Sequence, residues 1–109
     1  MTAVCFITSE ELIIGFELKG HSDYAEEGSD IVCAAVSSAA YMTANTITDI
    51  LCLEAEATAD DGYMMMRLSS QDALKAQDIL RGFELHMKEL SQQYQNNIKV
   101  VFRRCKDNA

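Results

Sequence analysis

The chain has 109 residues, of which 49% are hydrophobic; this length suits one domain, and this composition excludes a disordered protein. Its 17 acidic residues outnumber its 9 basic residues. The resulting net charge of −8 disfavours binding to nucleic acid, because an acidic surface repels phosphate groups. We therefore expect a single domain over residues 1–109 that has no nucleic-acid partner.

The four cysteines are spread along the chain, at Cys5, Cys33, Cys52 and Cys105. They form no CxxC pair and no cluster with histidine, so a metal site is not predicted. The N-terminus lacks the basic region and cleavage site of a secretory signal, and serine, threonine and asparagine interrupt the most apolar helical run before 18 residues. We expect no membrane span, and a cytoplasmic protein whose cysteines are reduced thiols.

The first half of the chain is predicted to form a hairpin, a long loop and a helix. Alternating apolar residues indicate two strands and a polar turn between them, at residues 2–7, 12–19 and 8–11. The ten residues from Gly20 to Ser29 read as a loop, and loops of this length in compact domains are usually functional. A 3.6-residue apolar period predicts a helix from Ile31 to about Cys52, with Asp30 as its N-cap.

The second half repeats the order of hairpin and helix and adds one strand. The predicted segments are a strand at 54–59, a turn at Asp61-Gly62, a strand at 63–68, a helix from Ser69 or Ser70 to about Tyr94, and a strand at 98–103. The order is thus ββαββαβ. Because both helices have one apolar face, they can pack on one side of a sheet. The predicted fold is a two-layer α+β sandwich with two helices on one face of a mostly antiparallel sheet.

His21 and Cys33 stand on either side of the loop and could act as a catalytic pair. Cys33 falls at about the third position of the predicted helix, where free backbone N–H groups and the helix dipole favour a thiolate and could form an oxyanion hole. An imidazole at His21 could hold the proton and donate it to a leaving amine. The negative charge of Asp30, three residues before Cys33, disfavours ionisation of the thiol. It helps catalysis only if the carboxylate caps the helix or orients His21.

The same residues also have a structural interpretation. Cys33 lies in a helix of small residues, where buried cysteine is a common packing residue. One histidine and one cysteine twelve positions apart are a weak signal by themselves. From the residues alone, catalysis and packing both remain open for Cys33, whereas the other three cysteines and His86 have no partner near them in sequence.

The stretch GHSDYAEEGSDIVCAAVS, residues 20–37, resembles the signature of the ribosomal-processing cysteine protease family, Prp. The signature is long and contiguous, and the resemblance covers nearly the whole chain. The matching residues are Gly20, His21, Ser22, Ala25, Gly28, Asp30, Ile31, Val32, Cys33, Ala34, Ala35, Val36 and Ser37.

The resemblance implies a cytoplasmic cysteine endopeptidase that removes an N-terminal extension from a large-subunit ribosomal protein of the L-twenty-seven type during ribosome assembly. It implies a homodimer that uses no metal or cofactor and has no membrane partner. It also implies that Cys33 is the nucleophile and His21 its proton-transfer partner. Asp30 is the candidate for an orienting or capping residue, and the loop and substrate-contact candidates are Gly20, Ser22, Gly28 and Ser37.

Two other functions remain to be weighed against the protease. The chain could be a non-enzymatic dimeric interaction module in ribosome assembly, in which Cys33 only packs the helix. It could also be a thiol redox sensor, although no resolving cysteine lies near Cys33 in sequence. Alkylation of Cys33 at neutral pH would separate a packing residue from the other two functions, and peptide cleavage would separate a protease from a sensor.

Overall fold

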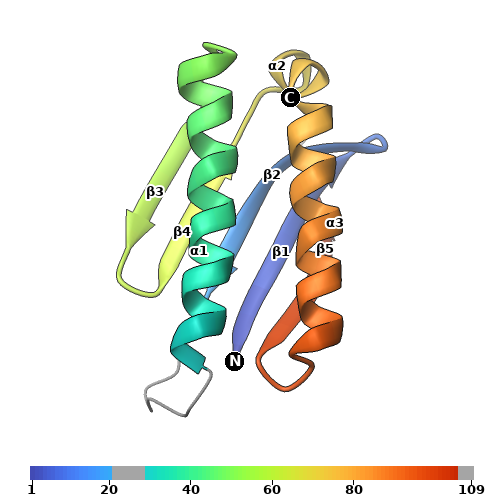
Figure 1. The fold of residues 1–109 in the computed structure, drawn as a ribbon. Helices are drawn as coiled ribbons and strands as arrows, with labels where there is room; N and C mark the ends of the chain where they lie inside the picture. Colours follow the sequence, from blue (N-terminus) through green and yellow to red (C-terminus); the bar gives the residue numbers. More distant parts are fainter. Residues whose placement is uncertain (21–28, 106–109) are drawn as a thin grey trace.

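A computed structural model describes residues 1–20 and 29–105, with side chains in the first helix from Ile31 onward. One five-stranded sheet is covered on one face by two long helices (Figure 1). The elements in chain order are β1 (Thr2–Ser9), β2 (Leu12–Lys19), α1 (Ser29–Asn45), η1 (Thr46–Ile50), β3 (Glu56–Asp60), β4 (Tyr63–Arg67), α2 (Ser70–Lys75), α3 (Gln77–Gln93) and β5 (Ile98–Arg104).

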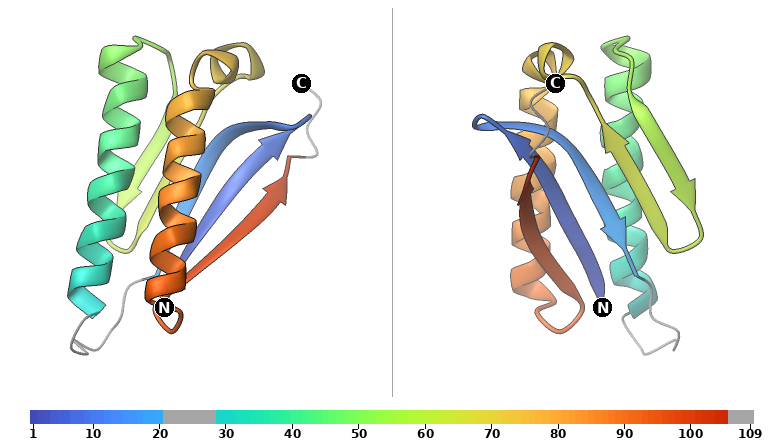
Figure 2. Two further views of the ribbon diagram at one scale, coloured as in Figure 1. Left: turned by 45° about the vertical axis from the view of Figure 1, so that its right-hand side comes forward. Right: turned by 180° about the vertical axis from the view of Figure 1, so that it is seen from behind.

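The strands are ordered β3-β4-β2-β1-β5 in the sheet, and the pairing of β1 with β5 is the single parallel pair in it. Seen from behind, the opposite face of the sheet has no helix over it (Figure 2). The predicted two-layer α+β fold with a mostly antiparallel sheet is therefore confirmed. The predicted strand positions also hold, with bounds that move by up to two residues.

The core lies between the helices and the covered face of the sheet. The rings of Phe6 and Phe16 both meet Phe83 edge-on, at centroid distances of 5.5 Å and 4.8 Å. These contacts join β1, β2 and α3, and aromatic pairs of this geometry stabilise a core beyond their buried area. Val32 and Val36 of α1 are almost completely buried, so the first two turns of α1 are held against the sheet.

The first helix does not end as a regular α-helix. It begins at Ser29, two residues before the expected start, and after α1 it continues as the π-helical turn η1. The hydroxyls of Thr43, Thr46 and Thr48 each donate a hydrogen bond to the carbonyl four residues earlier. Such side-chain bonds to the backbone loosen the end of a helix.

The second helix is broken, contrary to the expectation of one helix from Ser69 or Ser70 to Tyr94. α2 starts at an N-cap in which the Ser69 hydroxyl accepts from the Asp72 amide, and it ends at Ala76. The Gln77 side chain then bonds both backbone groups of Ile13 in β2, at 3.1 Å and 2.8 Å. This contact to β2 explains the break, because it fixes the chain at Gln77 to the sheet.

The helical run Ile31–Ile50 is continuous, and within the described ranges it is the one helix whose length and apolar composition would suffice to cross a membrane. The expectation that polar residues interrupt it short of such a length is therefore wrong. The core helix of a soluble protein meets the same criterion, and Val32, Val36 and Ala40 on its inner side are buried against the sheet. This finding alone does not assign the helix to a membrane.

The buried carboxylate of Glu17 is the centre of a polar cluster on the uncovered face of the sheet. This carboxylate accepts a hydrogen bond of 2.6 Å from the Tyr63 hydroxyl and lies 3.4 Å from Arg103 and 3.6 Å from Lys19. The Tyr63 hydrogen bond, assisted by the two cations, lowers the pKa of the Glu17 carboxyl, and the same bond raises the pKa of the Tyr63 phenol. The cluster ties β2 to β4 and β5.

Gly15 of β2 is required by the close approach of β4. A Cβ atom at Gly15 would overlap the carbonyl oxygen of Met66. Gly15→Ala should lower the free energy of unfolding by about 1–3 kcal/mol, because the central strand pair must separate to accept the methyl group. Urea denaturation measures this change.

Gly82 offers a matched control, because a Cβ there meets no atom within 4 Å and Gly82 lies inside α3. Gly82→Ala should raise the free energy of unfolding by about 0.5–1 kcal/mol through helix propensity. Equal effects of the two substitutions would contradict the close strand approach.

Glu17→Gln should lower the free energy of unfolding at pH 7 by more than it does at pH 3. A carboxyl whose pKa is lowered by folding contributes stability above its unfolded-state pKa, and this contribution is lost as the pH falls through the folded pKa. Urea denaturation at the two pH values measures the difference, and Tyr63→Phe should shrink it. If Glu17→Gln lowered the free energy of unfolding by the same amount at both pH values, the stabilising role of the ionised Glu17 carboxylate would be refuted.

Candidate functional site

The side chain of Cys33 lines a cavity of about 150 Å³ at the end of the sheet where β1 begins and β2 ends. The cavity lies between the start of α1 and the β3–β4 hairpin. Its lining residues are Thr2, Leu18, Gly20, Cys33, Val36, Ser37, Tyr41, Asp60, Gly62, Tyr63 and Met64. Of the predicted site residues, the structure thus brings together Gly20, Cys33 and Ser37.

Cys33 is the fifth residue of α1, one turn inside the helix rather than at about the third position. A helical side chain tilts toward the N-terminus of its helix, so Sγ still points back toward the first turn. The sulfur is half-buried and lies 3.8 Å from the hydroxyl oxygen of Thr2. Cys33 is therefore a partly accessible thiol in a cavity, not a fully buried packing residue.

Gly20 fixes the point at which the chain leaves β2. Its amide donates to the carbonyl of Gly62 at 3.0 Å, which joins it to the β3–β4 turn. Its φ of +95° suits only glycine, and a Cβ at Gly20 would lie 2.5 Å from the carbonyl oxygen of Met1. Gly20 is thus a structural residue of the cavity, immediately before His21.

His21, Ser22 and Gly28 lie outside the described residues, as does the side chain of Asp30. Their predicted roles as proton-transfer partner, loop contacts and orienting group therefore stay predictions. The backbone of Asp30 lies inside α1, one residue after its start, so the expectation that Asp30 is the N-cap is wrong.

Sequence reasoning missed Tyr41 of α1 and the residues of the β3–β4 hairpin that line the cavity. Ser37 and Tyr41 follow Cys33 at intervals of four residues, so all three share one side of α1. On the opposite side, Asp60 and Tyr63 come from the β3–β4 hairpin, and the Tyr63 hydroxyl is directed to Glu17 on the uncovered face of the sheet. The four-residue spacing from Cys33 was a signal for Ser37 and Tyr41, whereas Thr2, Asp60 and Tyr63 reach the site only through the sheet.

The other three cysteines line no part of this cavity. Cys5 is half-buried on β1, and burial raises the pKa of its thiol. Cys52 is exposed just after η1, and Cys105 accepts a hydrogen bond from the Arg67 guanidinium at 2.8 Å. No disulfide joins the cysteines, all of which belong to the described part of the chain.

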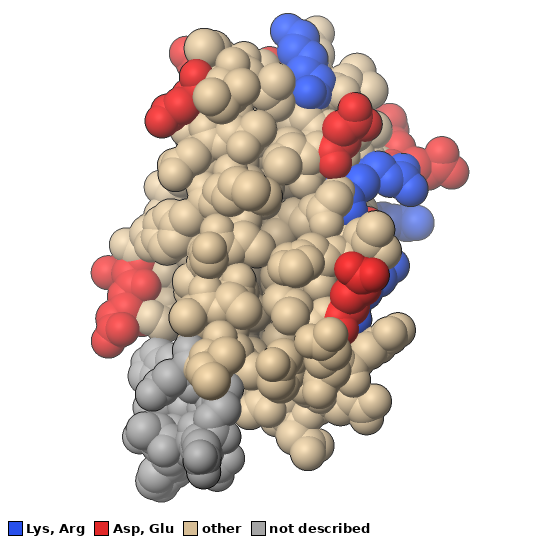
Figure 3. Space-filling model, in the orientation of Figure 1, with Lys and Arg blue, Asp and Glu red and all other residues tan. Residues whose placement is uncertain are grey.

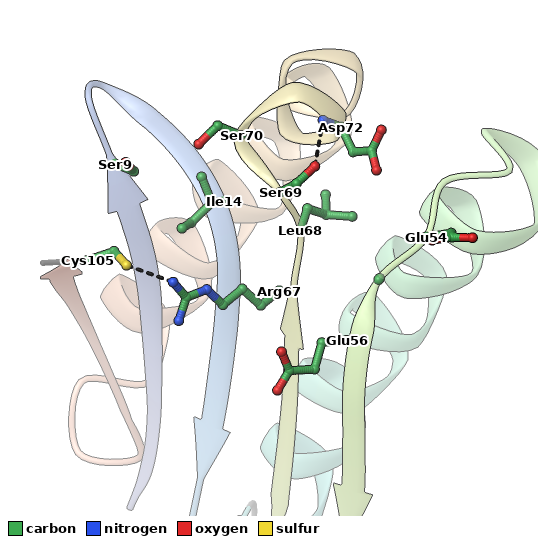
Figure 4. A pocket seen from close by; sticks show the side chains of 11 residues that line it. Ser9, Ile14, Glu54, Glu56, Arg67, Leu68, Ser69, Ser70, Asp72 and Cys105 are labelled. Atoms are coloured by element: carbon green, nitrogen blue, oxygen red, sulfur yellow. Dashed lines mark hydrogen bonds between the residues drawn. The ribbon is translucent and has the colours of Figure 1, made fainter. Parts of the chain in front are cut away.

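A second, larger cavity of about 670 Å³ lies at the opposite end of the sheet (Figure 4). It is open and mostly polar, and Arg67 points across it toward Cys105. Its other lining residues are Ser9, Ile14, Glu54, Ala55, Glu56, Leu68, Ser69, Ser70 and Asp72. Neither Cys33 nor any other residue of the 20–37 signature lines it. We therefore take the smaller cavity, and not this larger one, as the candidate catalytic site.

Comparisons with known proteins identify the family to which the chain belongs. Two proteins described as "Ribosomal processing cysteine protease Prp" are similar to this chain in sequence. The protein of Bacillus subtilis is 28% identical over 95 residues, 82% of this chain and 85% of its own length. The protein of Staphylococcus aureus strain Mu50 is 25% identical over 99 residues, 89% of this chain and 93% of its own length.

Solved structures show the same fold. SMU.848 from Streptococcus mutans superposes with a TM-score of 0.85 at 26% identity and covers 96% of both chains. An essential ribosomal processing protease Prp from Staphylococcus aureus, solved in complex with a covalently linked product peptide, has a TM-score of 0.82 at 25% identity and covers 94% of this chain and 100% of its own.

The family described as "Cysteine protease Prp" matches residues 1–99, which include the whole stretch from Gly20 to Ser37 and every residue that lines the Cys33 cavity. A match of this extent, together with the shared fold, shows that the chain belongs to the Prp family of cysteine proteases.

Proposed function

We propose that this cysteine protease removes the N-terminal extension of a large-subunit ribosomal protein of the L-twenty-seven type during ribosome assembly in the cytoplasm. The observation that carries the proposal is the half-buried thiol of Cys33 in a cavity bordered by Tyr41 of α1 and by the β3–β4 hairpin. The names of the related proteins support ribosomal processing, and the relative solved with a covalently linked product peptide supports a covalent mechanism.

In the proposed reaction, the Cys33 thiolate attacks the carbonyl carbon of the scissile peptide bond. The S–C bond forms, the C–N bond breaks, and the leaving amine takes a proton from the His21 imidazolium. Water then attacks the thioester and gives its proton to His21, which releases the carboxylate product and the thiol. No oxidant or metal enters this sequence, and the donors we propose for the oxyanion are backbone amides at the start of α1.

The cavity and the charge of the chain fit a peptide of this kind. A volume of about 150 Å³ suits one or two side chains of an extended peptide, and a lining that includes Leu18, Val36 and Tyr41 favours apolar or aromatic groups. The chain has a net charge of −8, which attracts a basic partner such as a ribosomal protein.

We also propose that two copies of this chain associate through α1. Residues 31–48 contain no charged side chain, and one stripe of α1 is exposed along its length. This stripe consists of Ile31, Ala34, Ser38, Met42 and Asn45. Figure 3 shows the uncharged surface over α1, with acidic groups at its margins. Two chains of charge −8 repel each other, so an uncharged surface is the one through which they can approach.

Cys33→Ala should abolish cleavage of the ribosomal protein with its native extension while it preserves the fold, because alanine suits this helix. The new N-terminus is measured by mass spectrometry. Cys52→Ala is the matched control, because it removes an exposed thiol far from the cavity, and it should cleave at the wild-type rate. His21→Ala should lower kcat about 10²–10⁴-fold. Processing by the Cys33 variant at a wild-type rate would refute the proposal.

Met42→Lys should convert the dimer into a monomer, because it places two like charges at the α1 stripe of the interface. Leu85→Lys is the control: Leu85 is 60% exposed and Met42 is 58% exposed, but Leu85 lies on the charged surface of α3. Sedimentation equilibrium measures the mass of each variant. A monomeric wild type, or a dimer that survives Met42→Lys, would contradict an interface at α1.

A further inference from the structure

The hydroxyl of Thr2 is placed against the thiol of Cys33. Thr2 is the first residue of β1, and its Oγ1 lies 3.8 Å from the sulfur. Only 6% of Thr2 is exposed, so its hydroxyl has little access to water. Within residues 1–20 and 29–105, the sulfur of Cys33 is the hydrogen-bond partner of this hydroxyl.

A buried hydroxyl at this position needs a reason. Valine has the same shape, favours strands at least as strongly and carries no polar group that must be satisfied. A buried hydroxyl that loses its partner costs more free energy than its hydrogen bond contributes when the partner is present. Packing alone therefore does not explain threonine at residue 2, whereas a hydrogen bond to Cys33 does.

Thr2 is held where it can act on Cys33. Its amide donates to the carbonyl of Asn97 at 2.8 Å, and it pairs with Ile98 at the start of β5. On its other side, Gly20 packs against the carbonyl of Met1 and the Cα of Thr2. Because the threonine side chain has few allowed rotamers, a fixed backbone also fixes the direction of the hydroxyl.

We propose that Thr2 is a positioning residue for the Cys33 nucleophile. Its O–H donates a hydrogen bond to the sulfur, which holds the thiol in one rotamer and stabilises the thiolate. The described titratable groups that line the same cavity are Asp60 and Tyr63 from the hairpin and Tyr41 from α1. None of them is seen to donate a hydrogen bond to Cys33. The inference rests on the proposed function, in which Cys33 is the nucleophile.

The test compares Thr2→Val, which keeps the shape and loses the hydroxyl, with Thr2→Ser, which keeps the hydroxyl. The rate of Cys33 alkylation by iodoacetamide is measured from pH 5 to pH 10 by peptide mass spectrometry, with exposed Cys52 as the internal control. We expect Thr2→Val to move the midpoint of the Cys33 profile to higher pH and to lower kcat about tenfold with a smaller effect on KM. Thr2→Ser should keep the midpoint of the Cys33 profile and kcat near their wild-type values, and the midpoint of the Cys52 profile should be the same in all variants.

Two outcomes would overturn the inference: a Thr2→Val profile that coincides with that of the wild type, or a Thr2→Ser profile that coincides with that of Thr2→Val. If circular dichroism shows that the valine variant does not fold, the same comparison is made between Thr2→Ala and Thr2→Ser. Failure of the proposed function is a different result. In that case Cys33→Ala would still cleave the ribosomal protein, whatever the Thr2 variants do.

Discussion

The register of the β1–β2 hairpin is the constraint on which the site depends. It pairs Ala3 with Lys19, so that Thr2 and Gly20 lie side by side at one end of the sheet. A slip of one residue would turn every strand side chain to the opposite face and would move Thr2 away from α1. Val4 and Phe6 are both buried in the core, and a slip of one residue would expose them; their burial therefore fixes the register. The same pairing that builds the core therefore places the floor of the cavity beneath Cys33.

The first helix packs on the sheet with one side and contributes residues to the cavity from the adjacent side. Its buried residues, Val32 and Val36, hold the first two turns against the sheet, and Cys33 and Ser37 are each the next residue along. The position of the Cys33 thiol is therefore set by the packing of Val32 and Val36 in the core. The β3–β4 hairpin supplies the other wall, and the hydrogen bond from Tyr63 to the Glu17 carboxylate on the uncovered face ties this hairpin to β2.

Local patterns in the sequence predicted the strands, the hairpin turns and the extent of both helical regions, because each of these features depends on the periodicity or turn preference of a few neighbouring residues. The family signature identified Cys33 and Gly20 for the same reason. The break at Ala76 was not predictable, because it comes from the Gln77 side chain and Ile13, 64 residues apart. Thr2 is 31 residues from Cys33, and only the pairing of β1 within the sheet brings them together. The strand order likewise depends on contacts that no local period reveals.

The central claim is that Cys33 forms a covalent bond to the substrate in a cavity built by β1, α1 and the β3–β4 hairpin. The most direct measurement is the mass of the protein after it is mixed with the extended ribosomal protein and quenched in acid within the first turnover. The account predicts an added mass equal to the acyl extension, located by peptide mapping on Cys33. A cleaved substrate with no adduct on any cysteine, or an adduct on Cys5, Cys52 or Cys105, would contradict it.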